Sequence, residues 1–175
     1  MTRKSYERTQ PREVYLNQRF LERKIRENLL SNRLNRPFVD EVRLIGSLAS
    51  EQFGVFYEPE LKHLHHPKYA SDVDLLITGD EAYPVPTEWG EGRPFIFFDV
   101  YNLGTLSDIK GVRNNVHEIE TWVYLPSQAD QPPRLTENIL EKMRMEQDPR
   151  LDFKTRKEWL NWQLKNHRNR IWYQK

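Results

Sequence analysis

The feature that most constrains the fold is a seven-residue run of mostly apolar side chains that contains one carboxylate. The run reads Phe95-Ile96-Phe97-Phe98-Asp99-Val100-Tyr101. It is too short for a buried helix and apolar on both of its faces, which predicts a central strand in a sheet that is covered on both sides. A carboxylate inside such a strand is costly to bury without a cation or strong hydrogen-bond donors. We therefore expect Asp99 to belong to a polar site built on the sheet.

Two earlier segments also read as strands and carry polar residues at defined positions. Residues 39–45 form an apolar-rich run that ends on Gly46-Ser47. The segment Ser71-Asp72-Val73-Asp74 leads into the apolar residues 75–77. Since residues i and i+2 of a strand point to the same face, Asp72 and Asp74 present two carboxylates side by side. A fourth short strand is predicted over residues 121–125.

The remaining segments predict helices and loops, and the whole chain predicts an α+β fold. An amphipathic helix is expected over residues 14–34, and Pro11, just before it, is a residue type that suits a first helical turn. Residues 106–117 are predicted to form a helix, with or without a preceding turn. Two further helices, broken at Asp148-Pro149, are expected over residues 134–175. The predicted organisation is a core of mixed sheet and flanking helices over 11–127, with an insertion at about 50–70, followed by a C-terminal helical extension packed on the core over 134–175.

Three carboxylates on neighbouring strands predict a metal site. If the strand that carries Asp99 pairs beside the Asp72 and Asp74 strand, the three groups repel one another unless a divalent cation lies among them. Hard oxygen ligands of this kind suit Mg²⁺ or Mn²⁺, which also bind nucleotide phosphates. The alternative is that Asp72 caps a turn, Asp74 faces solvent and Asp99 pairs with an arginine.

The Gly46-Ser47 pair fits the phosphate end of such a substrate. Glycine lets a phosphate approach the backbone closely, and the serine hydroxyl donates to phosphate oxygens. Ser71, before the first aspartate, is expected to orient the loop and counts among the candidate nucleotide-binding residues.

The order strand-Gly-Ser, then Asp-x-Asp and an apolar run, then a later aspartate on a strand resembles the DNA polymerase β-type nucleotidyltransferases, especially their minimal members. The likeness covers roughly residues 14–125. It implies a nucleotidyltransferase core in which Asp72, Asp74 and Asp99 are catalytic and bind Mg²⁺ or Mn²⁺, while Gly46 and Ser47 hold the triphosphate of an NTP, with ATP as the expected substrate. The reaction implied is transfer of a nucleoside monophosphate to an acceptor with release of pyrophosphate.

The chain departs from the minimal pattern between the two motifs. Residues 48–71 separate Gly-Ser from Asp-x-Asp, where the family has a gap of around ten residues, and no arginine follows the serine. The insertion contains His63, His65 and His66, which suit a solvated loop, a transition-metal site or contact with an anionic substrate.

The charge distribution and composition limit the kinds of partner that we expect. The ends are basic, with ten Lys/Arg against five Asp/Glu in residues 1–40 and seven against two in 151–175. The acceptor predicted is a partner protein, an RNA end or a small molecule, and the basic tail favours an RNA end. The tryptophans of the C-terminal helix could stack on bases, but their helical spacing favours packing in the core. The absence of cysteine excludes disulfides and thiolate metal sites. No apolar run is long enough for a membrane span, and we expect a cytoplasmic protein. A rival hypothesis is a non-catalytic nucleotide- or RNA-binding module on the same fold.

Overall fold

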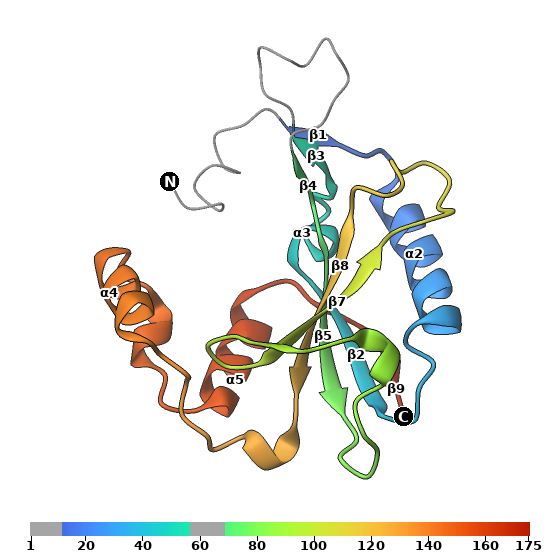
Figure 1. Cartoon of the computed structure of the whole chain (residues 1–175). Helices are drawn as coiled ribbons and strands as arrows, with labels where there is room; N and C mark the ends of the chain where they lie inside the picture. Colours follow the sequence, from blue (N-terminus) through green and yellow to red (C-terminus); the bar gives the residue numbers. More distant parts are fainter. Residues whose placement is uncertain (1–11, 57–68) are drawn as a thin grey trace.

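The computed structural model describes residues 12–56 and 69–175, and its main feature is a six-stranded mixed sheet with helices on both faces (Figure 1). The strand order is β6-β7-β8-β5-β2-β9. The strands are β2 (Val39–Ile45), β5 (Val73–Gly79), β6 (Arg93–Pro94), β7 (Asp99–Thr105), β8 (Glu118–Tyr124) and β9 (Arg170–Gln174). Only β5 and β8 pair in parallel, while the other neighbours are antiparallel. An α+β fold with a mixed sheet is therefore confirmed.

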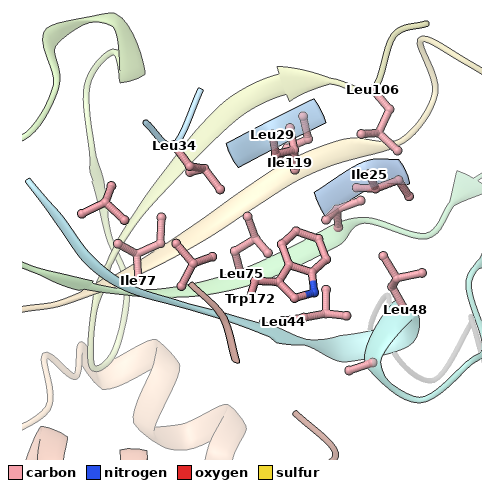
Figure 2. Close-up of a cluster of buried hydrophobic side chains, with 14 of the residues drawn as sticks. Ile25, Leu29, Leu34, Leu44, Leu48, Leu75, Ile77, Leu106, Ile119 and Trp172 are labelled. Atoms are coloured by element: carbon pink, nitrogen blue, oxygen red, sulfur yellow. The ribbon is translucent and has the colours of Figure 1, made fainter. Parts of the chain in front are cut away.

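One face of the sheet is covered by α2 (Gln18–Asn32), whose apolar side chains form the main core (Figure 2). Ile25 and Leu29 of this helix are fully buried against Leu75 of β5 and Trp172 of β9. The helix starts later than the predicted residue 14. Residues Arg12–Val14 instead form a short strand, β1, and Pro11 lies outside the described residues.

The opposite face is covered by the C-terminal helices α4 (Glu137–Met145) and α5 (Arg156–Asn166), as Figure 1 shows. Trp159 of α5 stacks on Trp122 of β8, with ring centroids 5.9 Å apart and planes 6° apart. Because Trp159 is buried in this second cluster, the core-packing role of its indole is confirmed. A 3-10 turn, η4 (Pro149–Asp152), separates the two helices at the predicted break.

The prediction that the C-terminal region is entirely helical is wrong at its end. Residues Arg170–Gln174 form β9, which pairs with β2 and lies at one edge of the core sheet. Trp172 is buried while Ile171 and Tyr173 are exposed, the two-residue alternation of a strand with one buried face. The last residues of the chain thus complete the core sheet.

The apolar run that contains Asp99 is not a continuous central strand. The Phe95 and Phe98 backbones exchange hydrogen bonds of 2.8 and 3.1 Å, so residues 95–98 form the tight turn of a hairpin between β6 and β7. Ile96, Phe97 and Phe98 are buried because this turn packs against α4 and α5. Burial by helices, and not a central position in the sheet, explains the apolar run.

The insertion contributes a second, small sheet next to the start of β5. Its order is β1-β3-β4, where β3 is Gly54–Phe56 and β4 is Tyr69–Ala70. The predicted histidine cluster at 63–66 lies outside the described residues. Over the described part of the chain, residues 106–117 form turns and no helix, contrary to the prediction. Within that same part, no helix combines the length and apolar character of a membrane span.

Candidate metal centre

The carboxylates that the structure brings together are Asp72, Asp74 and Glu120. Each offers an oxygen atom that lies within 4.8 Å of the others, and all three side chains are half-buried. Asp74 and Glu120 are directly aligned on the parallel strands β5 and β8, and Asp72 lies two residues before Asp74. The predicted pairing of Asp72 and Asp74 on one face of a strand is consistent with this geometry.

Asp99 does not join these carboxylates, which corrects the predicted metal set. Strand β8 lies between β5 and β7, so the strand that carries Asp99 does not pair with the aspartate strand. Asp99 is aligned with Val123, three residues beyond Glu120, and an odd offset places it on the other face of the sheet. Its carboxylate accepts a hydrogen bond of 2.9 Å from Arg134. This agrees with the alternative prediction that Asp99 pairs with an arginine.

Glu120 was not predicted, although the sequence contains a signal for it. The predicted strand began at Thr121, whereas β8 begins at Glu118. Ile119, Thr121 and Val123 are buried and alternate with exposed or half-buried residues. This two-residue alternation, followed back to Glu118, would have placed Glu120 on a polar face.

The Gly46-Ser47 turn lies directly against the cluster. Ile45, the last residue of β2, is aligned with Asp74, and Gly46 opens the short helix α3 (Gly46–Ala49). Gly46 has φ +73°, and an added Cβ would overlap Asp74 Oδ2 and lie 3.0 Å from Asp74 Cγ. Only glycine fits here, because any larger residue displaces the Asp74 carboxylate. The predicted closeness of the two motifs is thus present in the structure.

Ser47 adds a polar atom without a partner to the same turn. Its hydroxyl oxygen is shielded from solvent and has no hydrogen-bond partner among residues 12–56 and 69–175. A buried hydroxyl without a partner is uncommon in native structures, and a bound ligand is one way to satisfy it. The three carboxylates are hard oxygen ligands of the kind that suits a divalent ion, and the Ser47 hydroxyl lies on the turn next to them.

Ser71 has a positioning role instead of an evident ligand-binding one. Its hydroxyl accepts a hydrogen bond of 3.2 Å from the Gly54 amide, and its carbonyl oxygen lies 2.7 Å from His117 Nδ1. Since a carbonyl only accepts, His117 Nδ1 carries the proton and His117 Nε2 accepts from the Tyr15 hydroxyl at 2.8 Å. These bonds fix the turn that leads into Asp72, as the sequence predicted for Ser71.

His117 is fully buried and neutral in this arrangement. Desolvation by burial lowers the pKa of His117 below its usual value, although its hydrogen bond to the Ser71 carbonyl opposes the shift. The imidazole packs on Phe53, with ring centroids 4.5 Å apart. The histidine therefore ties the 106–117 turns to the backbone just before Asp72.

A partly buried ion pair supports the C-terminal end of α3. Arg170 of β9 donates to Glu22 of α2 at 2.8 and 2.6 Å and to the carbonyl oxygens of Leu48 and Ala49 at 3.2 and 2.9 Å. Burial alone would raise the pKa of Glu22. Hydrogen bonds from Arg170 and Trp172, with the charges of Arg170 and Arg19, outweigh burial and hold that pKa below its usual value.

A hollow of about 270 Å³ lies at the other end of the sheet and is lined by residues 36–38 and 83–88. Phe38 packs against Gly79, the last residue of β5, so this hollow is remote from Asp74 near the strand's start. Its polar groups include the Arg36–Glu88 ion pair. Within the described residues, side chains that could hold a metal ion converge at the three carboxylates and not at this hollow.

Comparison with known proteins identifies no relative of this chain. No family model matches it, and no curated protein or solved structure is significantly similar to it. The likeness to the polymerase β-type nucleotidyltransferases therefore rests on the motifs of this sequence alone.

Proposed function

We propose that this protein is a nucleotidyltransferase that uses Mg²⁺ or Mn²⁺ to transfer a nucleoside monophosphate from an NTP, with ATP the expected donor, to an acceptor. One observation carries the proposal: the carboxylates of Asp72, Asp74 and Glu120 converge beside the Gly46-Ser47 turn. Carboxylate oxygens that converge so closely are hard ligands of the kind that Mg²⁺ and Mn²⁺ prefer. The proposal keeps the chemistry that the sequence suggested and replaces Asp99 by Glu120.

The roles of the residues follow from their chemistry. Asp72, Asp74 and Glu120 would hold the divalent ions, which supply charge stabilisation at the attacking and leaving oxygens of an in-line displacement. Gly46 leaves room for the Asp74 carboxylate beside the turn, and the Ser47 hydroxyl would donate to a phosphate oxygen of the triphosphate. The acceptor oxygen forms a bond to the α-phosphorus while the bond to the pyrophosphate oxygen breaks. The acceptor proton passes to a carboxylate of the cluster.

The acceptor stays open among a partner protein, an RNA end and a small molecule. Lys154, Lys157 and Lys165 are exposed along the C-terminal helices and supply the positive charge that an RNA acceptor needs. An RNA acceptor predicts binding that weakens steeply with salt, whereas a small acceptor predicts activity without any macromolecule.

The test is pyrophosphate release from each of the four NTPs with Mg²⁺ and either total RNA, protein extract or small hydroxylated and amino compounds. We expect release with one acceptor class and its loss in Asp74→Asn and Glu120→Gln. Asp99→Asn is the matched control, since it removes a carboxylate of the same sheet outside the cluster, and it should retain activity. Nucleotide binding without turnover for every acceptor would favour the non-catalytic module instead.

A further inference from the structure

The side chain of Arg93, in the hairpin formed by β6 and β7, lies beside the cluster of Asp72, Asp74 and Glu120. The Arg93 guanidinium lies 3.4 Å from Glu120 Oε1. We infer that Arg93 is the residue that binds the triphosphate of the metal–nucleotide substrate, and that it leaves Glu120 when a divalent ion binds there. This inference rests on the proposed function and adds to it a substrate-positioning residue.

The backbone of Arg93 is fixed although its side chain is exposed. Arg93 is aligned with Val100 in the β6–β7 hairpin. A Cβ on the preceding Gly92 would lie 2.5 Å from Tyr101 Cζ, so the chain packs tightly against that ring. Arg134 holds the turn of the same hairpin by donating to the Phe95 carbonyl oxygen at 3.2 Å and to Asp99 at 2.9 Å. Arg93 therefore projects from a backbone that is paired in a hairpin, which suits a residue that positions a ligand.

The contact with Glu120 is too weak to hold the arginine in place. The Arg93 side chain is 67% exposed and that of Glu120 is 28% exposed. An ion pair this open to water contributes little to stability and is readily exchanged. A divalent ion bound to a Glu120 oxygen also repels the guanidinium, so metal binding weakens the Arg93–Glu120 pair.

A triphosphate is the natural new partner for the displaced arginine. The Gly46-Ser47 turn offers a hydroxyl and backbone groups but no charged side chain, because Leu48, Ala49 and Ser50 follow. A planar guanidinium binds two phosphate oxygens at once, which a lysine ammonium does not match. Arg93 then serves as a counter-ion to the cluster before the substrate binds and as a phosphate ligand afterwards.

This exchange predicts effects of opposite sign on two binding constants. Arg93→Ala removes a charge that competes with the metal, so the protein should bind Mn²⁺ alone several-fold more tightly. The same variant should bind α,β-methylene-ATP in the presence of Mn²⁺ at least about tenfold more weakly, the loss expected for a hydrogen bond to a charged group. Arg93→Lys should fall between wild type and Arg93→Ala for the nucleotide analogue.

Isothermal titration of the full chain with MnCl₂, and then with the analogue, measures both constants. Arg36→Ala is the matched control, because Arg36 also pairs with an exposed glutamate, Glu88, far from the cluster. If Arg93→Ala leaves both dissociation constants unchanged, or shifts both in the same direction, the inference about Arg93 is wrong. The proposed function still stands in that case if Mn²⁺ binding depends on Asp74. Absence of Mn²⁺ binding in wild type would overturn both.

Discussion

Replacing Gly46 by alanine should separate the stability of the fold from the integrity of the metal centre. At φ +73° an L-residue costs about 1–2 kcal/mol of backbone strain. The new methyl group would also overlap Asp74 Oδ2 and lie 3.0 Å from Asp74 Cγ. Relieving that overlap costs about 1–3 kcal/mol more, typical of overpacking. The carboxylate must rotate away, which removes it from Asp72 and Glu120.

Gly90→Ala provides the matched control for the backbone. Gly90 has φ +76°, and an added Cβ would meet no atom within 4 Å. That variant should therefore lose about 1–3 kcal/mol of unfolding free energy from strain alone. It should bind Mn²⁺ as wild type does, since nothing near the carboxylates changes.

Urea unfolding and electron paramagnetic resonance of free Mn²⁺ give the two readouts. We expect Gly46→Ala to lose about 2–5 kcal/mol of unfolding free energy and to weaken Mn²⁺ binding by at least about tenfold. If Gly46→Ala remains folded and binds Mn²⁺ with the affinity of wild type, the close approach of Gly46 to Asp74 does not order the centre, and the reasoning is refuted.

Three further changes test the supporting contacts. Glu22→Gln leaves the partly buried Arg170 without its carboxylate and should lower the unfolding free energy by about 3 kcal/mol in urea; a loss below about 0.5 kcal/mol would contradict a structural role for this ion pair. His117 has a folded-state pKa below its unfolded value, so its contribution is complete above about pH 6.5 and is lost as pH falls through the folded pKa. Between pH 7.5 and 5.5, wild type should lose more stability than His117→Asn, and equal losses would contradict the assignment. Asp99→Asn weakens the half-exposed pair with Arg134 and should cost about 1 kcal/mol while Mn²⁺ affinity stays unchanged; a loss of Mn²⁺ binding would return Asp99 to the metal set.

The local sequence pattern was sufficient to predict the strands that carry the Gly46-Ser47 and Asp72-Val73-Asp74 motifs. The apolar run 39–45 ends at a glycine, and β2 spans the predicted residues. The alternation around Asp72 and Asp74 also predicts the strand β5, because a two-residue period depends only on neighbouring residues. The amphipathic pattern of α2 likewise needs no knowledge of the sheet.

Long-range pairing explains what the sequence did not reveal. Asp99 and Glu120 both lie on strands that follow the aspartate motif, and only the strand order decides which carboxylate reaches Asp74. A run of buried aromatic residues has the same pattern whether it lies in a central strand or in a turn covered by helices, so the sequence of residues 95–98 does not distinguish the two. The strand β9 was missed because Trp172 also fits the apolar side of a helix that continues from α5.

The most direct measurement is the anomalous scattering of Mn²⁺ in a crystal of the full chain soaked with MnCl₂. We expect a peak between Asp72, Asp74 and Glu120, with oxygen ligands from all three side chains at about 2.0–2.2 Å. A peak at Asp99, or no manganese at the three carboxylates, would contradict this expectation.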